Sequence, residues 1–162
     1  MPSTKNVQNT HISDQLRQIH SAVLDIVGLM NRPQRDELLI QAAGIPLDRA
    51  LFPLLVGIER FGPIGVVEIA DRVGRDYTTV SRQVAKLESL GLVQRQASSA
   101  DRRVREAVIS PKGKAMTDLV DTAREKIGRT IFETWEARDV EELVRLMRKF
   151  ADALGAVPET NA

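Results

Sequence analysis

The sequence predicts a mainly helical protein that carries one small β-hairpin. Apolar residues recur at helical spacing in residues 67–73 and again in residues 77–90, with only a short turn between them. Residues 92–97 and 104–109 then change to the pattern of two strands around a polar loop. Helix, turn, helix and hairpin in this order predict a winged helix-turn-helix, flanked on both sides by further helices.

The second helix of the pair has recognisable ends and two different faces. Asp76 is a good N-cap because its carboxylate can accept from free N–H groups of the first turn, and Gly91 follows the last periodic apolar residue. Val80, Val84 and Leu87 fall on one side of the helix. The opposite side and its flank are small, polar or basic, which would let the helix enter a DNA major groove, about 12 Å wide. They comprise Thr78, Thr79, Ser81, Arg82, Ala85, Lys86 and Ser89.

A polar face alone does not establish DNA binding, because any amphipathic surface helix has one. The preceding short helix adds the missing context. Its predicted apolar residues are Val67, Ile69, Ala70 and Val73, and Gly74 ends it just before the capped helix begins. Two helices joined by so short a turn must cross steeply, as in a helix-turn-helix.

The hairpin loop, residues 98–103, has the sequence Ser-Ser-Ala-Asp-Arg-Arg. We expect Asp101 to hold Arg103 in one rotamer through a charge-assisted hydrogen bond, so that the guanidinium projects from the tip. Such an arginine suits a narrow A·T-rich minor groove, which attracts positive charge. An ordinary surface turn with a local ion pair is the alternative, and the hairpin by itself does not decide between them.

Positive charge is concentrated in the region of the helix pair and the hairpin. The whole chain has a net charge of only +1, but residues 72–114 contain ten Lys and Arg against four Asp and Glu. Residues 1–71 and 115–162 are both net acidic. This segregation is the electrostatic pattern of a phosphate-binding surface, whereas a merely solvated face more often mixes its signs.

Several motifs occur in a familiar order along the region from Leu47 to about Met116. They are Leu47, Gly62-Pro63, EIADRVG at 68–74, TTVSRQVAKLESLGLVQR at 78–95, Asp101-Arg102-Arg103, and then Ile109, Ser110, Lys112 and Gly113. In these motifs and their spacing the chain resembles the MarR family of bacterial transcription regulators. Three positions depart from the family pattern. Gly65 replaces a Ser or Thr cap, and Tyr77 is large for the start of the second helix. Pro53 lies in the preceding predicted helix, where it would cost about 3 kcal/mol unless the helix starts or bends there.

The resemblance implies a homodimer that binds a palindromic operator in double-stranded DNA, with the second helix of each subunit in a major groove and the hairpins at the minor groove. It also implies control by a small molecule, commonly an aromatic or phenolic anion. We expect a sequence-specific regulator, most simply a repressor released by such an effector. The candidate DNA-binding residues are Tyr77, Thr78, Thr79, Ser81, Arg82, Ala85, Lys86, Arg95, Asp101, Arg102 and Arg103. The candidate walls of an effector pocket are Ile19, His20, Val23, Phe52 and Phe61, each of which could equally be plain core.

The flanking segments have the apolar stripes that dimerisation would need. One runs from Ile12 to Met30, a second follows the hairpin from Met116 to Trp135, and a third runs from Val140 to Leu154. A two-fold dimer is the commonest way to bury such stripes, although they could also pack within one subunit. The predicted organisation is a flexible tail (1–11), N-terminal dimerisation helices (12–46), the winged helix-turn-helix (47–113), C-terminal dimerisation helices (114–155) and a second tail (156–162).

Composition excludes several other classes of function. The chain lacks cysteine and has only two histidines, so we expect no disulfide, thiolate metal site, cofactor or thiol switch. No arrangement of nucleophile, base and acid is recognisable, and we expect neither catalytic residues nor an enzyme. No segment is apolar enough for a signal peptide or a membrane span, which predicts a cytoplasmic protein. A winged helix that binds a protein partner remains the alternative function.

Overall fold

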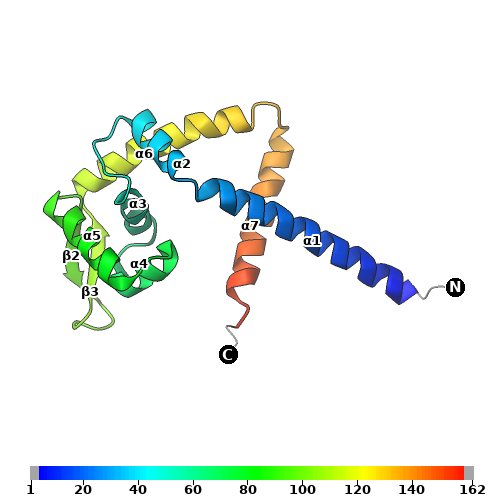
Figure 1. Ribbon diagram of the computed structural model, residues 1–162, viewed down its shortest axis with the longest axis horizontal. Helices are drawn as coiled ribbons and strands as arrows, with labels where there is room; N and C mark the ends of the chain where they lie inside the picture. The colour runs from blue at the N-terminus through cyan, green and yellow to red at the C-terminus, as the bar shows by residue number, and fades with distance from the viewer. Residues whose placement is uncertain (1–3, 159–162) are drawn as a thin grey trace. The chain divides into compact units, whose positions relative to one another are not determined.

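The computed structural model describes the backbone of residues 4–158 and the side chains of residues 11–158. None of its described helices is long and apolar enough to cross a membrane. The elements, labelled in Figure 1, are α1 (Thr4–Met30), α2 (Pro33–Ala43), α3 (Phe52–Phe61), β1 (Ile64–Gly65), α4 (Val66–Val73), α5 (Tyr77–Ser89), β2 (Val93–Ala97), β3 (Arg105–Ile109), α6 (Pro111–Ile131) and α7 (Ala137–Gly155).

The helix-turn-helix predicted from the sequence is formed by α4 and α5. Gly74 ends α4 in the left-handed conformation, with φ 65°, which glycine adopts without steric cost. The apolar face of α4 differs by one residue from the prediction, because Val67 is exposed and Val66 is buried in its place. Val66 lies three and four residues before Ile69 and Ala70, so these three share one face of the helix.

The predicted hairpin is confirmed, and a third strand joins it. Strands β2 and β3 pair antiparallel, and the two-residue strand β1 pairs with the other edge of β3, which gives the order β1-β3-β2. Ile64 lies opposite Ala107 in this pairing. Strand β1 was not predicted, because two residues are too few for a recognisable strand pattern.

The hydrophobic core lies between α3, the two helices of the helix-turn-helix and the sheet. Its fully buried side chains include Leu54, Leu55, Ile58, Ile64, Ile69, Val80, Val84, Leu87, Leu92 and Val93. Pro53 stands in the first turn of α3 and therefore removes no interior hydrogen bond. The predicted alternative that the helix starts at this proline is confirmed.

The described chain divides into two compact units, one ending at Thr122 and the other beginning at Ala123. The first contains the winged region, and the second contains α7. Helix α6 ends at Ile131, so Trp135, predicted to continue its stripe, lies beyond it and packs edge-on against Phe132 with ring centroids 5.1 Å apart.

The N-terminal tail predicted at residues 1–11 differs from the structure over most of its length. Helix α1 already begins at Thr4, so residues 4–11 are helical where a flexible tail was predicted. Residues 1–3 and 159–162 of the two predicted tails lie outside the described residues. The structure places the stripes of α1 and α7 on long helices, as the periodicity predicts.

Candidate nucleic-acid interface

The first turn of α5 is held by its N-cap. Asp76 Oδ1 accepts from the Thr79 backbone N–H at 2.9 Å, and the Thr79 hydroxyl donates to Asp76 Oδ2 at 2.6 Å. These bonds favour the ionised carboxylate and lower the pKa of Asp76, the side-chain bond from Thr79 more than its backbone bond. The predicted N-cap is therefore confirmed, and it fixes where the exposed face of α5 begins.

The two faces of α5 are separated as the sequence predicts. Val80, Val84 and Leu87 are fully buried, whereas Arg82 and Lys86 are exposed. Neither cation forms an ion pair with any residue in the described part of the chain, so both are available to a ligand. Of the other candidates on this helix, Tyr77, Thr78 and Ala85 are exposed and Thr79 and Ser81 are partly buried.

The last turn of α5 is attached to the start of α6. Leu92 N–H donates to the Leu87 carbonyl at 3.0 Å, and Gly91 has φ 72°, which together form a glycine-terminated helix end. The Ser110 hydroxyl donates to the Gly91 carbonyl at 2.6 Å and accepts from Gly113 N–H at 3.0 Å. Ser110 is thus both the predicted N-cap of α6 and a tether for the end of α5.

The hairpin loop is held by its own hydrogen bonds. Ser98 N–H donates to the Val104 carbonyl at 2.9 Å, and Val104 N–H donates to the Asp101 carbonyl at 3.0 Å. Asp101 Oδ1 accepts from the backbone N–H of Arg103 at 3.0 Å. The expected bond to the Arg103 guanidinium is not found among the described residues, because the carboxylate closes a local turn in the backbone instead.

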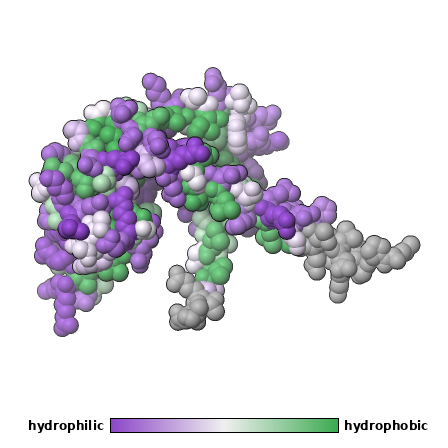
Figure 2. All heavy atoms as spheres, in the orientation of Figure 1, coloured by the Kyte–Doolittle hydropathy of each residue, from purple (hydrophilic) through white to green (hydrophobic). Residues whose placement is uncertain are grey.

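This correction changes how the arginine side chains are presented. The loop backbone is fixed, while the side chains of Arg102 and Arg103 extend from it and are exposed. The hairpin projects beyond α5 in Figure 1, and its tip is strongly hydrophilic in Figure 2. A fixed turn with freely adjustable guanidinium groups can follow the surface of a DNA groove.

Arg95 differs from the other cationic candidates. Its side chain is only 18% exposed, and its Nε lies 3.5 Å from Glu88 Oε2 at the end of α5. The Nε atom is buried without a well-aligned hydrogen bond. Arg95 therefore packs at the base of the hairpin, where it is less accessible to a ligand than Arg82 or Arg103.

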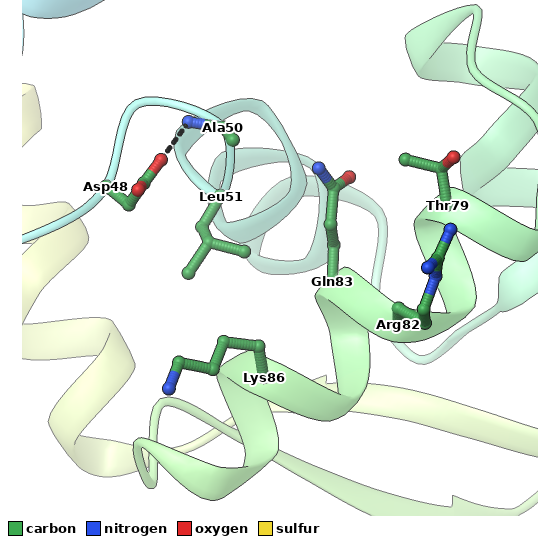
Figure 3. A pocket seen from close by; sticks show the side chains of 7 residues that line it. All are labelled: Asp48, Ala50, Leu51, Thr79, Arg82, Gln83 and Lys86. Atoms are coloured by element: carbon green, nitrogen blue, oxygen red, sulfur yellow. Dashed lines mark hydrogen bonds between the residues drawn. The ribbon is translucent and has the colours of Figure 1, made fainter.

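A hollow of about 390 Å³ lies beside the exposed face of α5 (Figure 3). Its walls come from α5 and from the loop that leads into α3. The lining residues are Asp48, Ala50, Leu51, Thr79, Arg82, Gln83 and Lys86. Thr79, Arg82 and Lys86 are predicted from the sequence and Gln83 is not, although residues 79, 83 and 86 share one helical flank. The loop residues carried no sequence signal, because only folding brings them to α5.

The candidate effector residues differ in how far they are buried. Phe52 is buried in the core of the winged region, whereas Phe61 is half-exposed and lies under the Arg72 guanidinium, 4.1 Å from the ring centroid. On α1, Ile19 and His20 are exposed and Val23 is partly buried. None of the five lines the hollow beside α5. Among the described residues, no group of three or more His, Cys, Asp and Glu could hold a metal ion.

Comparisons with known proteins agree with this architecture. The model of the MarR family matches residues 47–104. An uncharacterized HTH-type transcriptional regulator, YxaD of Bacillus subtilis (strain 168), is 31% identical over 106 residues, which are 64% of this chain and 74% of that protein.

Two solved structures share the fold over most of their length. The transcriptional regulator BldR from Sulfolobus solfataricus aligns with a TM-score of 0.63 at 23% identity, over 88% of this chain and 97% of that one. A MarR transcriptional regulator from Methanosarcina mazei Go1 aligns with a TM-score of 0.62 at 24% identity, over 86% of this chain and 98% of that one. At these identities the structural likeness supports the fold alone.

Proposed function

Because this chain belongs to the MarR family, whose members are DNA-binding transcription regulators and not enzymes, we propose that it is a dimeric, cytoplasmic repressor released by a small effector. The membership rests on the family match and the Bacillus subtilis relative. Repression, the dimer and an aromatic or phenolic effector are our proposals for this chain.

One observation carries the proposed DNA-binding surface. Helix α5 and the hairpin belong to the same compact unit, and each presents exposed basic side chains from a backbone fixed by its own hydrogen bonds. We call Arg82, Lys86, Arg102 and Arg103 the basic face. A backbone fixed in this way loses little freedom on binding, and the positive charge of the side chains suits phosphates and groove edges. We propose that Arg82 contacts a base edge and that Arg103 lies at the minor groove.

Exposed apolar side chains support a dimer. On α1, Ile12, Leu16 and Met30 are each about half-exposed in the single chain. Helix α7 likewise exposes Val144 and Met147, and Figure 2 shows hydrophobic atoms along this helix. Stripes of this length are normally covered, and a second copy of the chain would cover them symmetrically.

A module that binds a protein partner is the second candidate. Such a module would be expected to expose apolar side chains on α5, where this chain has Ser81, Arg82, Ala85 and Lys86. The net positive charge of the winged region also favours a polyanion. Binding to duplex DNA in dilute buffer discriminates between the two, since a protein-binding module should ignore it.

The test is protection of the DNA upstream of the protein's own gene, with affinities measured by fluorescence anisotropy. A dimer should protect two half-sites about 10 base pairs apart. Arg82→Ala should relax the preference at one base position by about 1–3 kcal/mol, whereas Arg103→Ala should weaken all duplexes and reduce the salt slope by about one. No binding to any duplex at low salt would refute the proposed function.

The proposed effector needs a separate test. Ile19, His20, Val23, Phe52 and Phe61 stay the proposed walls, and the burial of Phe52 favours a core role for that residue. A thermal-shift screen of aromatic acids, followed by anisotropy on the bound operator, should find a compound that stabilises the protein and releases the DNA. A flat response across the screen would count against control by such a ligand.

A further inference from the structure

The turn of the helix-turn-helix contains an arginine that is bound on two sides. Arg75 follows Gly74, and its side chain is partly buried. Its Nη1 donates to the Ala50 carbonyl at 2.6 Å and to Gln83 Oε1 at 3.0 Å. Arg75 therefore connects the loop before α3 to the flank of α5, through two residues that line the hollow, Ala50 and Gln83.

This contact determines which part of the Gln83 amide is available. A guanidinium can only donate hydrogen bonds, so the amide atom that faces Arg75 must be the oxygen. The Nε2 group has no hydrogen-bond partner among the described residues. One lone pair of Gln83 Oε1 is thereby used, and the Nε2 group is the part of the amide that is free to donate, whereas an unrestrained glutamine could bind adenine through both atoms.

Two of the other groups that line the hollow, Arg82 and Lys86, contribute positive charge. The Thr79 hydroxyl donates its proton to Asp76 and therefore offers no donor to a ligand. Asp48 is the acidic exception. Its Oδ1 accepts from Ala50 N–H at 2.7 Å, and it lies on the loop side of the hollow, away from Arg82 (Figure 3). A ligand between Gln83, Arg82 and Lys86 would meet donors and positive charge.

We propose that this hollow holds a backbone phosphate of the operator, bound by Gln83 Nε2 and Lys86, and that Arg75 is the positioning residue that orients Gln83. The inference rests on the proposed DNA-binding function of α5. A phosphate fits better than a base edge because Gln83 lies on the flank of α5, about 100° around the helix from Arg82, and not on the face that would enter the groove.

The decisive experiment replaces single operator phosphates by neutral methylphosphonates and measures affinity by anisotropy. One substituted position should weaken the wild-type dimer at least fivefold. Gln83→Ala should weaken binding to intact operator and to unrelated duplex by similar factors, about three- to tenfold, and should be less sensitive at that position because only Lys86 still contacts the phosphate. A loss confined to one base pair, or undiminished sensitivity at every phosphate, would overturn the proposal.

Two further variants separate charge from orientation. Gln83→Ala should leave the salt dependence of binding unchanged because glutamine is neutral, whereas Lys86→Ala should reduce the slope of log affinity against log salt by about one. In an Arg75→Met background, Gln83→Ala should have little additional effect on affinity. If the two losses are instead independent, Arg75 does not orient Gln83.

The outcomes also distinguish this proposal from the proposed function. If the wild-type protein binds no duplex, the regulator assignment fails as a whole. If Arg82→Ala weakens binding while Gln83→Ala and Arg75→Met do not, only the phosphate site fails.

Asp48→Asn is the matched control. This variant can retain the bond to Ala50 N–H but removes the acidic charge from the hollow, so it should strengthen binding to every duplex. Unchanged or weaker binding by Asp48→Asn would contradict a phosphate in this hollow.

Discussion

The contact between the first turn of α6 and the backbone just before β2 allows no side chain at Gly113. A Cβ at this position would lie 2.1 Å from the Leu92 carbonyl oxygen and 2.7 Å from Ile109 Cδ1, whereas ordinary contacts are 3.4 Å or longer. The Ser110 N–H also donates to that carbonyl, at 3.1 Å. Gly113→Ala would therefore force backbone to move, and flexible side chains could not absorb the change.

The expected loss of stability follows from these contacts. Overpacking of a close-packed site costs about 1–3 kcal/mol, and each hydrogen bond that is stretched forfeits up to about 1 kcal/mol. Helix propensity offsets about 0.5–1 kcal/mol, since alanine is favoured over glycine in helices. We expect Gly113→Ala to lower the free energy of unfolding by about 2 kcal/mol, combining these ranges.

Gly128 provides a matched control in the same helix. No atom lies within 4 Å of a Cβ built at this position in the single chain, so Gly128→Ala should raise stability by about 0.5–1 kcal/mol. Urea unfolding should be compared at equal protein concentration, with the oligomeric state checked by light scattering, because dimer stability depends on concentration. Equal shifts for both variants would show that the Gly113 contact does not constrain the fold.

Three other predictions concern the cap, the hairpin and the dimer. The pKa of Asp76 is lowered in the folded protein, so the carboxylate stabilises the fold above the unfolded pKa of about 3.9, and this stabilisation is lost as pH falls through the folded pKa. The urea midpoints of wild type and Asp76→Ala should therefore converge in acid. A difference that stays constant with pH would show that the ionised carboxylate is not the cause. Asp101→Ala should weaken DNA binding without changing global stability. Asp101→Asn should bind nearly normally, because its amide oxygen can still accept from Arg103 N–H. Equal losses of affinity for the two variants would show that the charge of Asp101, and not this hydrogen bond, matters. Light scattering should detect monomers for Val144→Glu if α7 is an interface, and an intact dimer would place the interface elsewhere.

Local signals in the sequence were sufficient for the helix-turn-helix and the hairpin. Caps, left-handed glycines and apolar periodicity act within a few residues, so Asp76, Gly74 and the buried face of α5 could be identified directly. The same is true of Ser110, whose side chain caps the next helix. The motifs of this region also identified the family correctly.

The contacts that individual atoms make were decided only by the three-dimensional structure. The partner of Asp101 is a backbone N–H instead of the expected guanidinium, and short-range pattern cannot choose between two donors on one residue. Arg75 meets Ala50 across 25 positions, and a two-residue strand pairs with β3 without any periodic signal. Sequence periodicity specifies which face of an element is buried, but the atoms that meet across that face depend on how the elements pack in three dimensions.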